Sequence, residues 1–151
     1  MAEATTALDI VPVWKRFNDG LIRLVDYVPD DQINWSPRED LWNFRGILLH
    51  LAATRDSWLG GVTGEEPMGD HVWKTARSKE DIKQAYARTW DRVERFVSDP
   101  PGLTKMYDDE EGPVSGHWIA FHLLEHDIHH RADILHYLAL LKIEHPDVGT
   151  P

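Results

Sequence analysis

Apolar residues recur every three or four positions along four stretches of the chain, which is the spacing of one face of an α-helix. This pattern predicts helices from about Ala7 to Tyr27, from about Asp40 to Leu59, from Ser78 to about Val97, and from Ser115 or Gly116 to about Ile143. No stretch alternates apolar and polar residues convincingly enough to predict a sheet. We therefore expect an all-α fold in one domain, residues 1–151.

Helix-breaking residues separate these stretches. Ser78, with Asp81 three residues later, is typical of a helix start, because it provides a cap and an acidic first turn. The helix ends are predicted at Val28-Pro29-Asp30-Asp31, at Gly60-Gly61 and at Asp99-Pro100-Pro101-Gly102. Two long loops, 60–77 and 103–116, complete a four-helix bundle, an architecture that places metal sites between facing helices.

The composition narrows the possible functions. The chain has 151 residues, a net charge of −10 and no cysteine, which excludes disulfides, thiolate nucleophiles and cysteine-ligated metals. Its scattered lysines and arginines disfavour nucleic-acid binding. No apolar run approaches the ~20 residues of a membrane span, and the N-terminus lacks the pattern of a secretory signal. We expect a soluble cytoplasmic protein whose metal ligands, if any, are imidazole, carboxylate, carbonyl or water.

Histidine is concentrated towards the end of the chain. Five of the nine histidines lie in the fourteen residues from His117 to His130. His126 and His130 stand four residues apart in an apolar stretch with helical spacing, so both imidazoles project from one helical face, one turn apart. Two imidazoles at this spacing can bind one divalent ion, which makes a metal site the leading hypothesis.

A third ligand is expected from a neighbouring helix, because catalytic zinc-type sites typically use three protein ligands. His50 is the candidate, since it lies in the nearly pure apolar stretch 47–53. A buried imidazole without a partner costs on the order of 1–3 kcal/mol. Either a metal or a hydrogen bond to a carboxylate or carbonyl satisfies it, and with His126 and His130 on another helix we favour the metal.

Other residues are candidates for supporting roles. His122 continues the stripe of His126 and His130 one turn earlier, as a fourth ligand, a substrate-facing group or, the reading we favour, a surface histidine. Asp133 lies three residues after His130 on the same face and can orient its imidazole. Glu125, Asp127 and Asp56 are further candidates for orienting carboxylates. Trp42, Trp118, Trp73 and Tyr107 are candidates for pocket walls, although for each of them alone we favour a place in the core.

The segment His126-Asp127-x-x-His130 superficially matches the His-Glu-x-x-His helix of zinc proteases. In those enzymes the glutamate activates water, whereas here the shorter aspartate takes its place. The chain also predicts no strand-bearing substrate cleft. A protease is therefore disfavoured.

These motifs together resemble the DinB-like (DinB/YfiT) family over essentially the whole chain. The resemblance is carried by Leu48-Leu49-His50-Leu51-Ala52, by the turn Asn34-Trp35-Ser36-Pro37 and by the run from Glu125 to Ile134. It implies an up-down-down-up four-helix bundle, with nickel or zinc held by His50, His126 and His130. It also implies a homodimer and, by likeness to some members, S-transferase or isomerase chemistry with a low-molecular-weight thiol.

The chain departs from the family pattern after His130. The family often has His-His-Arg-Gly-Gln where this chain has His129-His130-Arg131-Ala132-Asp133. Asp133 places a charge near the expected metal, which puts any particular substrate in doubt but leaves the metal site intact.

Three functions remain open. The first is a metal-dependent enzyme, either a thiol S-transferase or a hydrolase of a small-molecule substrate, with an open position on the metal. The second is a non-catalytic protein that binds a metal or is stabilised by it. The third is a metal-free interaction module with packed histidines. We favour the first.

Overall fold

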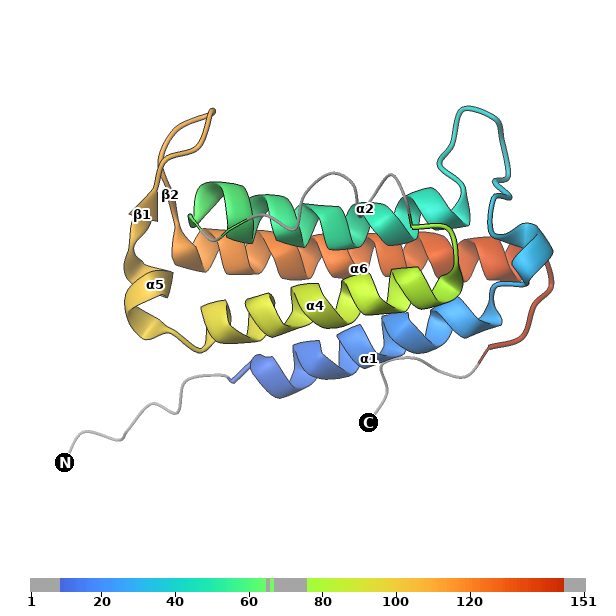
Figure 1. The fold of residues 1–151 in the computed structure, drawn as a ribbon, viewed down its shortest axis with the longest axis horizontal. Coiled ribbons are helices and arrows are strands. Elements are labelled where there is room, and N and C mark those ends of the chain that lie inside the picture. The colour runs from blue at the N-terminus through green and yellow to red at the C-terminus, as the bar shows by residue number, and fades with distance from the viewer. Residues whose placement is uncertain (1–8, 65, 67–75, 146–151) are drawn as a thin grey trace.

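A computed structural model of the chain describes residues 9–64, 66 and 76–145. Four long α-helices lie side by side (Figure 1), namely α1 (Val11–Tyr27), α2 (Phe44–Asp56), α4 (Lys79–Val97) and α6 (Gly116–Leu140). Both α1 and α2 pack against α4 and α6. The predicted all-α class is therefore confirmed, and α2 and α6, which carry the candidate ligands, are direct neighbours.

Several short elements join the long helices. A 3-10 turn (η1, Asp30–Gln32) follows α1, a π-helix (η2, Ser57–Val62) extends α2, and α5 (Pro100–Thr104) follows α4. The strands β1 (Met106–Tyr107) and β2 (Val114–Ser115) pair antiparallel. The prolines expected to end the third helix thus also begin a new helical turn, and strands of two residues are too short to show alternation.

The second helix differs most from its prediction. It begins at Phe44 rather than near Asp40, because the side chain of Asn43 caps it by accepting a hydrogen bond from the amide of Gly46 at 2.8 Å. Asp40 instead accepts a hydrogen bond from Nε of Arg38 at 2.9 Å. At the other end the chain continues through the two glycines as the wider η2 helix, so the predicted stop at Gly60-Gly61 is wrong.

The other helix starts agree better with the sequence. Ser78 and Asp81 form a reciprocal capping box at α4, and Ser115 caps α6 by accepting from the amide of Trp118 at 3.1 Å. The first helix starts at Val11, with Pro12 in its first turn, where a missing N–H is tolerated. The earlier part of its predicted range, residues 7 and 8, lies outside the described residues.

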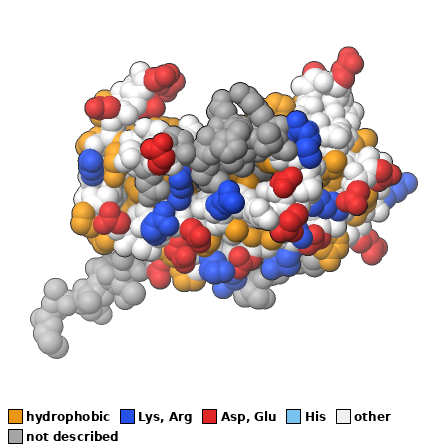
Figure 2. Space-filling model, viewed as in Figure 1, with side chains coloured by type: hydrophobic (Ala, Val, Ile, Leu, Met, Phe, Trp, Pro, Cys, Tyr) orange, Lys and Arg blue, Asp and Glu red, His pale blue; other side chains and the backbone are white. Residues whose placement is uncertain are grey.

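Most charged side chains lie on the outside, whereas Arg55, Asp56 and Asp127 are buried. On the face drawn in Figure 2, acidic and basic side chains are interspersed between apolar ones. Among the described residues, no helix combines the length and apolar character needed to cross a bilayer.

The start of α6 offers a test of how tightly the helix packs. A Cβ on Gly116 would lie 2.2 Å from the carbonyl oxygen of Gly102 and 2.6 Å from Cα of Leu103. Because these are backbone atoms, we expect Gly116→Ala to lower the free energy of unfolding by about 2–3 kcal/mol, measured by urea denaturation. Gly61→Ala is the control, since nothing lies within 4 Å of the added methyl, and equal stability of the two variants would contradict this packing.

Candidate metal centre

Three imidazoles from two helices meet between α2 and α6. Nε2 of His50 lies 2.9 Å from Nε2 of His126. One ring nitrogen from each of His50, His126 and His130 falls within 4.8 Å of the others, and all three side chains are half-buried. Nitrogens bound at ~2.1 Å to one ion are themselves about 3–3.4 Å apart, so this group fits a divalent cation. The structure therefore brings the three predicted ligands together.

Asp133 orients one of these imidazoles. Its carboxylate lies 2.9 Å from Nδ1 of His130. Because a carboxylate accepts, Nδ1 carries the proton, and in the neutral ring the lone pair then lies on Nε2. A carboxylate placed in this way also makes the imidazole a stronger donor to a metal. The orienting contact proposed for Asp133 is present.

The surroundings keep two of the rings neutral. Burial, followed by the neighbouring charges of His130, His50, His122 and His129, lowers the pKa of His126 to about 4. Burial and then His130 also lower the pKa of His50. Neutral imidazole is the form that binds metals, so at neutral pH these rings have the required protonation state.

Trp42 covers one side of the group. It precedes α2 in the chain, yet its ring lies 4.4 Å from that of His50 and 6.1 Å from that of His130, measured between centroids. Its carbonyl accepts a hydrogen bond from the hydroxyl of Tyr137 on α6 at 3.0 Å. The tryptophan is 52% exposed and lines a cavity, so the core position we favoured for it is wrong and the alternative of a pocket wall fits.

Further aromatic rings lie around His122, one helical turn before His126. The ring of Trp118 stacks on that of His122 at 4.9 Å with the planes 8° apart, and Trp58 meets the same imidazole edge-on. The centroids of His122 and His126 are 6.0 Å apart. His122 is partly buried and lines a cavity together with His126.

Two cavities reach the histidines. One, of about 450 Å³, is lined by Trp42 and its neighbours before α2 and by one face of α2 that includes His50. The other, of about 240 Å³, is lined by His122, Glu125, His126, His129 and His130. Both cavities include ligands of the candidate group in their walls, so the group is not sealed within the core.

Asp127 does not take the orienting role considered for it, because it is buried in an ion pair with Arg55. Asp56 forms an ion pair with Arg92. Asp127 likewise cannot act as a protease-like base. Tyr107 is buried in a core cluster, where its hydroxyl donates to the carbonyl of Gly102 at 3.1 Å. The suggested wall residue Trp73 lies outside the described residues.

A second group of potential ligands adjoins the first. His129, His130 and Asp133 also offer atoms within 4.8 Å of one another. His129 is exposed, however, and Nδ1 of His130 already donates to Asp133. A metal bound to this group would therefore compete with an existing hydrogen bond, and the more buried group of His50, His126 and His130 is the stronger candidate for a metal centre.

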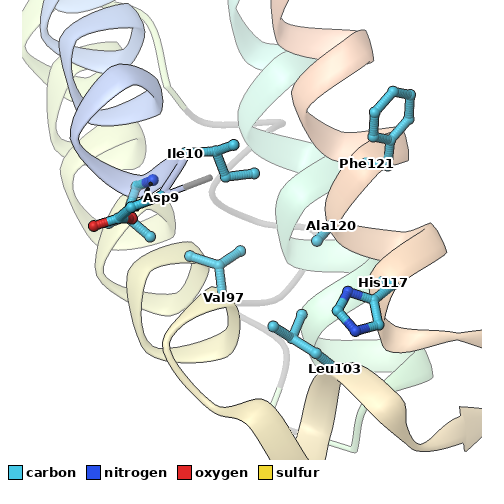
Figure 3. Close-up of a pocket in the computed structure, with 8 residues that line it drawn as sticks. Asp9, Ile10, Val97, Leu103, His117, Ala120 and Phe121 are labelled. Atoms are coloured by element: carbon cyan, nitrogen blue, oxygen red, sulfur yellow. Dashed lines mark hydrogen bonds between the residues drawn. The ribbon is translucent and has the colours of Figure 1, made fainter. Parts of the chain in front are cut away.

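Another cavity, of about 310 Å³, lies near the start of α6, away from the histidine group. Figure 3 shows Ile10, Val97, Leu103 and Ala120 around it, with His117 at its edge. His117 precedes His126 by nine residues, which is on the order of 13 Å along a helix. The cavity walls are largely apolar and contribute nothing to the metal centre.

The role of Arg55 was not foreseen from the sequence. Its side chain is fully buried and binds Asp127 at 2.6 Å. A signal was present, because Arg55 continues the inward stripe of Leu48, Leu51 and Ala52 at helical spacing. A charged residue on that stripe indicates a buried partner of opposite charge.

The chain is similar to known proteins in fold and in sequence pattern. The model of the DinB superfamily matches residues 14–134. A crystal structure of a DinB-like protein from Bacillus cereus ATCC 10987 superposes with a TM-score of 0.75 at 17% identity, covering 92% of this chain and 95% of the other. That likeness shows the fold. Among curated proteins, none matches the chain significantly.

The lowered pKa of His126 predicts how the metal-free protein responds to acid. Its folded pKa of about 4 lies below the ordinary value of 6.5, so between these values the unfolded chain binds more protons and stability falls as the pH falls. At pH 5 we expect this histidine to reduce the free energy of unfolding by roughly 1–2 kcal/mol relative to pH 7. In urea denaturation, the free energy of unfolding of His126→Gln should depend less on pH than that of the wild type. The same pH dependence in the wild type and the variant would contradict the prediction.

Proposed function

This chain belongs to the DinB superfamily, and from that premise we propose that it is a divalent-metal-dependent enzyme with His50, His126 and His130 as ligands. The observation that carries the proposal is the convergence of three ring nitrogens within 4.8 Å, beside two accessible cavities. Nickel and zinc are the proposed ions, since imidazole ligands suit both.

The residues around the centre have distinct proposed roles. Asp133 holds His130 in the tautomer that presents Nε2, while Trp42 and Trp118 bound the space where a small molecule would lie. A metal with an open position lowers the pKa of a water or thiol that it binds and so supplies a nucleophile near neutral pH. The protein's part is to hold three neutral imidazoles and to limit access.

The proposed reaction is transfer of a low-molecular-weight thiol or hydrolysis of a small molecule. Two features support a small substrate, namely the modest cavities of about 240 and 450 Å³ and the aromatic side chains at their edges. The thiol comes from the family resemblance.

We also propose the finer architecture and the assembly that this resemblance implies. In Figure 1 the colour advances in one direction along α1 and α6 and in the opposite direction along α2 and α4, which supports an up-down-down-up bundle. The proposed assembly is a homodimer. It is supported by the exposed apolar side chains Trp118, Phe121 and Ile128 on α6, because large apolar groups gathered on one helix are typical of interaction surfaces.

A second candidate is a non-catalytic protein stabilised by its metal. It is favoured by the placement of ligands on two separate helices, since an ion there would link α2 to α6 and stabilise the folded state. Both candidates predict a lower melting temperature after chelation, so turnover is what separates them.

Removing a ligand should abolish metal retention. We expect His126→Ala to weaken Zn²⁺ or Ni²⁺ binding by more than about 100-fold, exceeding the loss typical of an outer-shell partner. Elemental analysis of protein purified without a nickel column, together with metal titration, measures this. The matched control is His136→Ala, an exposed histidine on the same helix. Loss of binding in His129→Ala with retention in His50→Ala would instead identify the neighbouring group as the site.

Catalysis should follow the metal. We expect the metal-loaded protein to accelerate the reaction of a small thiol with a model electrophile, or the hydrolysis of a small ester or amide, because an ion with three protein ligands keeps a position open. His126→Ala should lose this activity and His136→Ala should keep it. Metal binding without turnover across such a panel would favour the non-catalytic candidate, and activity that survives in His126→Ala would contradict a metal-dependent mechanism.

A further inference from the structure

A buried ion pair joins the same two helices that carry the metal ligands. Nη2 of Arg55 on α2 lies 2.6 Å from Oδ2 of Asp127 on α6, and Nε lies 3.3 Å from Oδ1. Arg55 is 0% and Asp127 is 1% exposed. The pair is therefore bidentate and completely withdrawn from water.

The remaining helices fix this pair from the sides. From α1, the indole of Trp14 donates to Oδ2 of Asp127 at 2.8 Å, and the amide oxygen of Asn18 accepts from Nη1 of Arg55 at 2.8 Å. From α4, the hydroxyl of Thr89 lies 3.5 Å from the same Nη1. All four long helices thus contribute to one connected polar group, which fixes the rotation and the height of α6 relative to α2.

Stability alone does not account for such a group. Withdrawing two charges from water costs several kcal/mol per ion, and replacing a buried pair by apolar residues of similar volume is often neutral or stabilising. Unlike apolar side chains, the ion pair makes a directional contact. Its two hydrogen bonds form at one register of the helices and break when one helix shifts by one residue, about 1.5 Å along its axis.

The metal centre depends on that register. Asp127 directly follows His126, and Arg55 follows His50 by five residues. A slide or rotation of α6 that breaks the bond to Arg55 also moves His126 away from His50, and metal–nitrogen bonds of ~2.0–2.1 Å tolerate little displacement. We propose that Arg55 and Asp127 are positioning residues that set the separation of His50 and His126, an inference that rests on the metal-ligand role proposed above.

The test removes both charges while keeping volume. The variant Arg55→Met/Asp127→Leu leaves no unpaired buried charge, so the folded state is expected to persist. Co²⁺ alone is the probe, because titration gives its affinity and its visible absorption spectrum reports the coordination geometry. We expect the affinity to fall by about tenfold or more and the spectrum to change, whereas a purely structural role would alter only the melting temperature.

A second ion pair provides the matched control. Arg92 on α4 binds Asp56 on α2 at 2.6 Å, also largely buried, but none of the three proposed ligands lies on α4. We expect Arg92→Met/Asp56→Leu to change stability and to leave the affinity for Co²⁺ within about twofold, with an unchanged spectrum.

The outcomes separate the two proposals. If wild-type protein binds Co²⁺ and the folded Arg55→Met/Asp127→Leu variant binds it with the same affinity and spectrum, the positioning role is wrong and the metal site stands. An equal loss in the Arg92→Met/Asp56→Leu control also overturns it. If the wild type does not bind Co²⁺, both proposals fall.

A conservative variant covers the case in which the double variant does not fold. Arg55→Lys keeps the charge and loses the bidentate contact. We expect this variant to bind Co²⁺ with an affinity about threefold lower or weaker still, and to show a changed Co²⁺ absorption spectrum. Wild-type values in Arg55→Lys would overturn the positioning role.

Discussion

The metal chemistry proposed for this protein depends on the alignment of α2 with α6. One imidazole comes from α2 and two come from α6, so local helix geometry places His126 and His130 relative to each other but cannot place His50. The distance from His50 to His126 depends on how α2 and α6 pack together, because the two histidines are 76 positions apart in the chain. We propose that the packing of all four helices, together with the polar group of Arg55 and Asp127 within it, sets this distance and so allows the three imidazoles to share one ion.

Features governed by local rules could be predicted from the sequence. The capping box of Ser78 and Asp81 marks the start of α4 because both partners lie within one turn. The pairing of His126 with His130 follows from helical periodicity alone. The start of α2 was misplaced because Asp40 and Asn43 are both capping residue types, and the hydrogen bond to the amide of Gly46 distinguishes them only once the fold is known. The end of the second helix was also misplaced, because glycine permits a helix to end without requiring it, and here the chain continues as a helix through Gly60 and Gly61.

Contacts between segments far apart in the chain were harder to predict from the sequence. His50 could be inferred because an imidazole among leucines needs a partner, but Asp127 and Asp56 could not be assigned, since small differences in helix rotation decide whether a carboxylate meets an imidazole or a guanidinium. The contact of Trp42 with His50 needs a turn held by Tyr137, 95 residues away. Asp133 was an easier case because its partner lies three residues away on the same helix.

We propose that His50, His126 and His130 together hold one divalent ion. Anomalous X-ray diffraction from crystals of the zinc- or nickel-loaded protein can show this, because the metal appears as a peak whose ligands can be identified. We expect one strong peak between α2 and α6, at about 2.1 Å from a nitrogen of each of the three imidazoles. A peak bonded instead to His129 and Asp133, or no ordered peak in protein that retains the metal, would contradict it.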